Sequence, residues 1–361
     1  MTDKKFIVAQ FLQKGKLLTP EALEYIYSRG DMAIDSEGIL ISLEKLENVA
    51  DSVKILKNLA QKPKEIRTED FIRFYSSKYE RMKNIILNRL QKDFISLNRL
   101  DASRNEVFVL GIVKDLKEKD GKKIVELEDL TTSVAIVFDE INVELDDVIA
   151  VRAISAGKIL YGKELVYPDI PIRSPTKGKG KACFVSDLHL EQSPRQDIEN
   201  FFKWFSSLGI KYLFIAGDTG EKNILDGIVK EYCSDKKIFI IPGEVDSDKE
   251  YPQLAEDFSS SNIISLSNPA MVEINGIKIL IIHRFGMNML KTRYLGKSKV
   301  ILPDDYLALE EVPDIVHCGS THEPFVTNYK SVTIVNSGSP LSEFRPVIVD
   351  FATRDVEQAR I

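Results

Sequence analysis

Residues 182–190 read Ala-Cys-Phe-Val-Ser-Asp-Leu-His-Leu, a short apolar run that ends in an aspartate and a histidine. A continuous apolar run of this length predicts a buried strand, so the two polar residues stand where the strand ends. Five similar runs follow along the chain, with helical segments between them, at 212–216, 238–241, 277–282, 315–318 and 332–335. Strands that alternate with helices predict an α/β domain over residues 182–361, with its site at the strand ends.

Polar residues of the types that bind metals follow several of these runs. They occur as Asp187-Leu188-His189, Gly217-Asp218, Gly243-Glu244-Val245-Asp246, His283 and Gly319-Ser320-Thr321-His322. Carboxylates and imidazoles that converge from several strand ends can hold two divalent metal ions, which clamp a phosphodiester and activate a water. A single strand-end aspartate or histidine often only caps a helix or satisfies a loop amide, so the ordered set carries the prediction. His317 lies inside a predicted strand, where a core residue is favoured over a substitute ligand.

This order and spacing resemble the calcineurin-like metallophosphoesterase family, whose pattern is DxH, GDx, GNHD, a lone histidine and GHxH. The resemblance covers residues 182–345 and implies an α/β sandwich. It implies that a first metal ion is bound by Asp187, His189 and His322, and that Asp218 is the bridging carboxylate. The second ion would be bound by His283 and Glu244.

Three positions depart from the family pattern. Glu244 replaces the asparagine of GNHD, Val245 replaces its histidine, and Ser320 replaces the first histidine of GHxH. Valine neither donates a hydrogen bond nor transfers a proton, which leaves Asp246 as the weak candidate for a catalytic role in this motif. The resemblance still implies a divalent metal ion, Mn²⁺, in one or two sites, whereas these substitutions would weaken catalysis. The sequence names no substrate-binding residue.

The chain upstream of residue 182 divides into three further parts. Residues 1–100 are predicted to be a helical region, with helical segments at 4–12, from Thr19-Pro20 onward, at 43–61 and at 68–90. Residues 101–172 contain short β-type runs at 107–113, 123–127, 133–138 and 148–153, which suit a small closed barrel of the OB-fold class. Residues 173–181 read as a basic linker, favoured as a solvated hinge over a phosphate contact.

Composition limits the functional classes. The 361 residues carry a formal net charge of −6, so nucleic acid must be met through a local basic surface or a second subunit. Three cysteines without CxxC spacing argue against a zinc knuckle or a disulfide scaffold. No apolar run approaches the roughly 18 residues that span a bilayer, so we expect a cytoplasmic protein without a membrane partner.

The order of the parts narrows the resemblance. A β-barrel that ends in Tyr167-Pro168-Asp169-Ile170-Pro171 and is followed by the phosphoesterase resembles the small subunits of archaeal D-family DNA polymerases, which are related to eukaryotic replicative polymerase B-subunits. The resemblance implies an accessory subunit that binds the large catalytic subunit in DNA replication and meets DNA largely through the complex. It also implies a manganese-dependent 3′→5′ exonuclease, which the altered positions would weaken or abolish.

Other readings stay open at this point. The leading alternative is an active proofreading exonuclease with a rearranged second metal site. A free-standing phosphodiesterase or a nuclease for double-strand breaks is disfavoured, because such enzymes generally begin with the phosphoesterase domain. The sequence therefore leaves the activity of the chain itself undecided.

Overall fold

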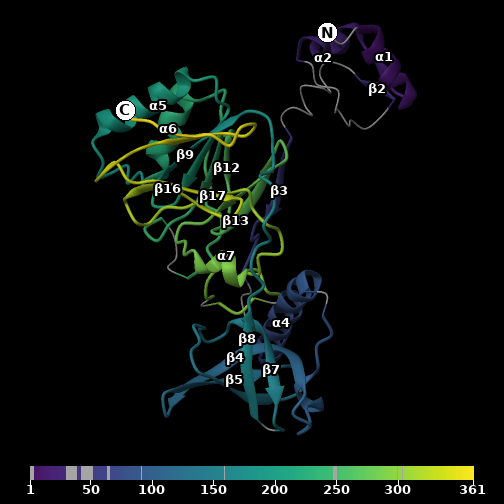
Figure 1. The fold of residues 1–361 in the computed structure, drawn as a ribbon. Helices are drawn as coiled ribbons and strands as arrows, with labels where there is room; N and C mark the ends of the chain where they lie inside the picture. The colour runs from purple at the N-terminus through teal and green to yellow at the C-terminus, as the bar shows by residue number, and fades with distance from the viewer. Residues whose placement is uncertain are drawn as a thin grey trace.

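A computed structural model describes residues 4–29, 39–41, 52–62, 66–90, 92–157, 159–246, 250–298, 300–302 and 304–361. It shows a two-sheet body, a barrel joined to the body by a long helix, and a small pair of helices near the N-terminus (Figure 1). None of the helices in these ranges combines the length and the apolarity that a membrane crossing requires.

The first sheet of the body has the order β12-β11-β10-β9-β18-β19. Its strands are β9 (Lys181–Ser186), β10 (Tyr212–Ala216), β11 (Lys237–Ile241), β12 (Ile263–Ser265), β18 (Val347–Asp350) and β19 (Val356–Gln358). Neighbours among the first four strands pair in parallel, as the alternation of strands and helices predicts. One face is covered by α5 (Arg195–Ser207) and α6 (Lys222–Tyr232), whose buried apolar residues share a cluster with alternate residues of β9, β10 and β11.

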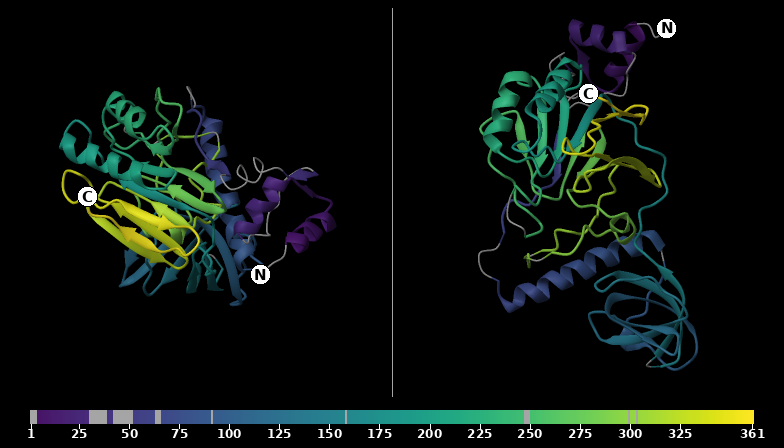
Figure 2. Two further views of the ribbon diagram at one scale, coloured as in Figure 1. Left: turned by 90° about the horizontal axis from the view of Figure 1, so that it is seen from above. Right: turned by 90° about the vertical axis from the view of Figure 1, so that its left-hand side faces the viewer.

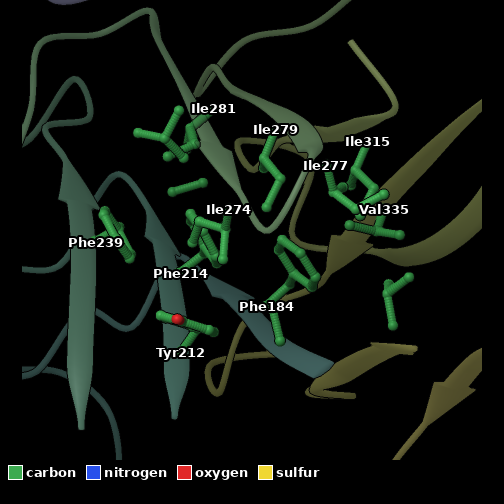
Figure 3. Close-up of a cluster of buried hydrophobic side chains, with 14 of the residues drawn as sticks. Phe184, Tyr212, Phe214, Phe239, Ile274, Ile277, Ile279, Ile281, Ile315 and Val335 are labelled. Atoms are coloured by element: carbon green, nitrogen blue, oxygen red, sulfur yellow. The ribbon is translucent and has the colours of Figure 1, made fainter. Parts of the chain in front are cut away.

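The second sheet has the order β16-β17-β15-β14-β13-β3. Its strands are β3 (Val53–Lys57), β13 (Ala270–Ile274), β14 (Ile277–Ile281), β15 (Ile315–His317), β16 (Pro324–Tyr329) and β17 (Val332–Ser337). The main core lies between the sheets, where the stacked rings of Phe184, Phe214 and Phe239 face isoleucines of β13 and β14 (Figure 3). Burying this apolar surface on both inner faces holds the two sheets together.

The edge strand β3 corrects one sequence prediction. Residues 43–61 were expected to be helical, but Val53–Lys57 is a strand that pairs antiparallel with β13, with Ile55 opposite Val272. Residues 43–51 of that segment lie outside the described ranges. The apolar residues of this segment have helix-like spacing, but pairing with β13 makes it a strand. The sequence gives no sign of this pairing, because β13 lies more than two hundred residues further along the chain.

The second β region is a closed barrel with the strand order β4-β5-β6-β8-β7. Its strands are β4 (Glu106–Lys119), β5 (Lys122–Glu128), β6 (Ser133–Phe138), β7 (Val148–Ser155) and β8 (Ile159–Val166). Four of the strands match the predicted runs. The strand β8 is not predicted from the sequence, because most of its side chains lie outside the barrel core and give no clear apolar signal.

The long helix α4 (Thr68–Leu90) has the predicted bounds and connects barrel and body (Figure 2). Its buried residues Tyr79, Met82 and Ile86 share one cluster with barrel residues and with Ala308 of the body. Near the N-terminus lie α1 (Lys4–Gln13) and α2 (Pro20–Arg29), together with β1 (Leu17–Leu18) and β2 (Leu40–Ile41). The Ala22 N–H donates to Thr19 Oγ1 over 3.3 Å, so Thr19 caps the start of α2, where the sequence predicts a helix to begin. Two short helices complete the described elements, η1 (Leu97–Arg99) and α7 (Asn288–Thr292).

Candidate metal centre

The predicted site residues lie in the loops that follow five strands. Asp187 and His189 follow β9, Asp218 follows β10, and the 243–246 loop follows β11. His283 follows β14, and the loop after β15 carries His322. The carboxyl ends of parallel strands meet at one edge of each sheet, which brings loops that are far apart in sequence together.

The backbone at this edge adopts an uncommon conformation. Asp187, His189, Asp218 and His322 have φ values of 52°, 42°, 46° and 55°, in the left-handed region that side chains with a Cβ rarely occupy. Such conformations persist only where the surrounding structure imposes them, and they concentrate at functional sites. The loops are therefore shaped to direct these side chains inward.

Among the described residues, two groups of potential metal ligands form at this edge. One consists of Asp187, His189 and His322, and the other of Asp187, Asp218 and His283, with ligand atoms within 4.8 Å of one another in each group. His283 Nε2 lies 3.1 Å from Asp187 Oδ1 and 3.5 Å from Asp218 Oδ2. His189 Nε2 and His322 Nε2 are 3.2 Å apart. The first group is the set expected for the first metal ion, and Asp187 belongs to both groups.

The chemistry of this cluster fits a divalent cation. Asp187 is fully buried and Asp218 is 7% exposed, and two buried carboxylates this close together need positive charge or protons beside them. Burial alone would lower the pKa of His283, but the hydrogen bond to Asp187 and the charges of nearby carboxylates together raise it. Among the residues that the structure describes, the Nδ1 of His283 is buried without a hydrogen-bond partner. Imidazole nitrogens with carboxylate oxygens suit manganese, iron or zinc.

Three glycines allow the loops to approach this closely. A Cβ at Gly217 would lie 2.5 Å from the His283 ring, and one at Gly243 would lie 2.1 Å from Asp218 Oδ1. A Cβ at Gly319 would lie 2.7 Å from Asp187 Oδ2. The glycines of the motifs are therefore required by the contacts between strand ends.

Asp246 fastens two of the loops to each other. Its Oδ1 accepts a hydrogen bond from the Gly220 N–H over 2.8 Å, and its Oδ2 accepts from the N–H groups of Thr219 and Gly243. Asp246 belongs to neither ligand group among the described residues. These bonds give it a structural position, and its catalytic role stays a prediction.

The three altered positions lie at the mouth of the cluster. Glu244 forms an ion pair with Arg284 and is in neither ligand group of the described chain, so its predicted metal ligation gains no support from this geometry. Val245 has an exposed side chain, and its N–H donates to Asp218 Oδ1 over 2.9 Å. The Ser320 N–H donates to both carboxylate oxygens of Asp187. At positions 245 and 320, the backbone supports the carboxylates although the family's imidazoles are missing.

Several residues that support the site were missed by the sequence analysis. Asn268 Oδ1 accepts from the His283 N–H over 3.2 Å, Asn268 Nδ2 donates to Gln253 Oε1, and Gln253 Nε2 donates to the Gly243 carbonyl. This series of hydrogen bonds connects the loops after β11 and β14. No motif in the sequence marks Asn268 or Gln253, because their role depends on contacts that form only in the fold.

His317 is a core residue, as its place inside a strand favours. It is fully buried, and its ring lies edge-on to Phe184 with centroids 5.1 Å apart. Burial lowers its pKa to about 3, so the ring is neutral near neutral pH. Among the described residues it belongs to neither ligand group.

The chain is similar to known proteins, both in its two-sheet body and over most of its length. Residues 181–359 match the calcineurin-like phosphoesterase superfamily domain. The DNA polymerase II small subunit of Archaeoglobus fulgidus is 27% identical over 82% of this chain and 76% of that protein. The DNA polymerase II small subunit of Thermoplasma acidophilum is 26% identical over 93% of this chain and 86% of that protein. The chain belongs to the archaeal DNA polymerase II small-subunit family.

Apart from β3, the two-sheet body is the part of the chain that matches the phosphoesterase domain. The matched superfamily domain begins at the first residue of β9 and extends to the end of the second sheet and beyond, so it includes all the loops of the metal centre. The phosphoesterase fold implies divalent metal ions, and the two ligand groups lie where such ions would bind.

Proposed function

We propose that this chain is the accessory subunit of a D-family DNA polymerase, in which it binds and supports the large catalytic subunit during DNA replication. The observation that carries this proposal is the similarity to DNA polymerase II small subunits over most of the chain, including the part that precedes the phosphoesterase domain. A phosphoesterase alone would leave about half of the chain unexplained.

We assign the parts of the chain to roles within this function. The strand order of the closed barrel supports an OB-fold over residues 101–172, which we assign mainly to protein contacts, and its Phe138 is buried in the barrel core and not available for base stacking. Residues 1–100 form the N-terminal region, residues 173–181 the linker and residues 182–361 the phosphoesterase domain, to which the strand at 53–57 is added. Contact with DNA occurs largely within the complex, and the protein acts in the cytoplasm.

The metal centre is proposed to bind Mn²⁺ but to hydrolyse DNA weakly or not at all. Its proposed ligands are Asp187, His189, Asp218, His283 and His322. Val245 lacks the imidazole that would contact the phosphate and assist the leaving group. General acid–base catalysis contributes typically about 10²- to 10⁴-fold, so the loss of that group is sufficient to explain an impaired site.

An active 3′→5′ proofreading exonuclease with a rearranged second metal site is the second candidate. The convergence of all five ligands favours this candidate. A site without any function would not be expected to keep two buried carboxylates beside three histidines. The two candidates share the same partner and differ only in the chemistry at the metal centre.

Co-expression with a D-family large subunit tests the accessory role. We expect a stable complex that stays together through size-exclusion chromatography at moderate salt. If the two chains elute separately, the proposed function is wrong, whatever the state of the metal centre.

Exonuclease assays with manganese separate the two candidates. Loss of 3′ nucleotides from single-stranded or mismatched DNA, abolished by Asp218→Asn, would establish the active enzyme. An inactive chain that becomes active when Glu244→Asn, Val245→His and Ser320→His are combined would establish the impaired site. Activity that survives Asp218→Asn would point to a contaminating nuclease.

A further inference from the structure

Arg284 and Glu244 form an ion pair at the edge of the metal centre. Arg284 directly follows His283 after β14, whereas Glu244 lies in the loop after β11, so the pair joins two loops of the site. The side chains are 69% and 44% exposed, in contrast to the buried ligands beside them. The pair therefore lies in solvent at the mouth of the cluster.

The backbone beneath the pair is held close to the metal ligands. His283 is 1% exposed and bonds to Asp187, and its N–H donates to Asn268. On the other loop, the Val245 N–H donates to Asp218. Arg284 and Glu244 are therefore each one residue away in the chain from a residue that contacts the cluster, so the pair lies beside the metal centre.

The Arg284 guanidinium is a positive group beside several carboxylates. These carboxylates lie at the metal centre or its mouth, and an approaching phosphodiester is an anion as well. The carboxylates belong to Asp187, Asp218, Asp246 and Glu244. A guanidinium binds phosphate in the same bidentate geometry in which it binds carboxylate. Glu244 therefore occupies Arg284 in the way that a phosphate would.

The pair is also weak enough to be exchanged. An ion pair between exposed side chains contributes only about 0–1 kcal/mol, because water screens both charges. A phosphate that is also held by metal ions has the advantage of further contacts. Replacement of the Glu244 carboxylate by such a phosphate therefore needs little free energy.

We propose that Arg284 binds a backbone phosphate of the nucleic-acid strand at the metal centre, and that Glu244 is a built-in competitor that occupies Arg284 until the strand arrives. The inference rests on the proposed function, since it takes nucleic acid as the ligand of the site. It gives Glu244 a role as counter-ion in place of metal ligation. The asparagine of the family motif carries no charge and cannot compete in this way.

The experiment measures binding of a fluorescein-labelled single-stranded oligodeoxynucleotide to the full chain by anisotropy, over a range of salt concentrations. Mn²⁺ stays in the buffer, and a hydrolysis-resistant phosphorothioate backbone keeps the oligodeoxynucleotide intact. We expect Glu244→Gln to tighten binding about 3- to 10-fold, because it frees the guanidinium. Arg284→Gln should weaken binding by a similar factor and reduce the slope of log K against log salt by about 0.7, the contribution of one phosphate contact on a single strand.

The double variant tests whether Glu244 acts through Arg284. We expect Glu244→Gln to have no effect in the Arg284→Gln background, because the competitor then has nothing to occupy. Equal tightening in both backgrounds would show simple charge repulsion and overturn the proposal. An unchanged salt slope for Arg284→Gln, or no binding by any variant, would overturn it as well.

A matched control lies at the opposite end of the same strand. Glu311 is paired with Lys278 near the start of β14, and Glu311→Gln removes the same charge from an exposed ion pair. We expect it to leave binding unchanged, and an effect equal to that of Glu244→Gln would overturn the proposal. Complex formation with a large subunit is measured separately, so failure of this inference is distinguishable from failure of the proposed function.

Discussion

At the scale of single residues, the metal centre depends on positions where no side chain fits. The loop glycines at 217, 243 and 319 each lie against a candidate ligand of another loop. These glycines belong to the sequence motifs, but only the distances between the loops show why glycine is required at these positions. The approach of the β11 loop to Asp218 is the closest of these contacts.

Gly243→Ala is therefore expected to damage both stability and metal binding. The added Cβ would lie 2.1 Å from Asp218 Oδ1 and 2.2 Å from the Asp218 amide nitrogen, so the loop must move. Overpacking of this kind costs about 1–3 kcal/mol of unfolding free energy. Urea denaturation measures the stability, and titration calorimetry with Mn²⁺ measures the loss of affinity.

Gly227→Ala is the control for this substitution. Gly227 lies in α6 and a Cβ there meets no atom of the described residues within 4 Å, so the helix should gain about 0.5–1 kcal/mol from the replacement. Mn²⁺ affinity should stay at the wild-type value. If the two alanine variants behave alike, the close approach at Gly243 does not control the site.

At the scale of elements, the sequence predicts those whose stability is local or whose apolar pattern is strong. The bounds of α4 and β10 agree with the sequence analysis, because a long amphipathic helix and a continuous apolar run give clear signals. In contrast, β3 was not predicted because its pairing partner β13 lies far along the chain, and β8 was not predicted because most of its side chains lie outside the barrel core. The candidate ligands were found for the same reason as β10, because each lies within a few residues of the end of such a run. Arg284 and Asn268 were not, because a surface ion pair and an amide contact leave no pattern.

The segment 52–62 is expected to be required by the body. In addition to the pairing of β3 with β13, the Leu59 N–H donates to Ser267 Oγ and the Ser267 N–H donates to Asn58 Oδ1, each over 2.8 Å. A chain that begins at Ile66 loses these bonds and exposes the edge of β13, which invites aggregation. We expect a lower thermal midpoint and loss of soluble protein, measured by scanning calorimetry and by light scattering.

A chain that begins at Ser52 is the matched comparison. It lacks α1 and α2 but keeps β3, so its body should melt at the temperature of the full chain. Equal behaviour of the two truncated chains would contradict a structural role for β3. This comparison also tests whether the body needs any of the first 51 residues.

At the scale of the whole molecule, two connections tie the barrel to the body. The helix α4 packs against both, and Arg81 on it forms ion pairs with Asp304 and Glu310 of the body. The second connection leaves β8, where Ile170 is buried in the body and Arg173 Nη2 donates to Asp314 Oδ1 over 2.7 Å. The predicted linker is therefore held at its first residue, which differs from a free hinge.

Ile86→Ala is expected to loosen the barrel from the body. Ile86 is fully buried in the cluster that α4 shares with both parts, and removing a buried isoleucine side chain to alanine costs about 2–5 kcal/mol. The loss falls at the junction, so calorimetry should show separate melting of barrel and body, and a protease should cut within residues 174–180 more rapidly. Ile72→Ala on the same helix is the control, because Ile72 is 66% exposed and its truncation should change neither measurement. A single unchanged transition for Ile86→Ala would mean that the second connection alone holds the two parts together.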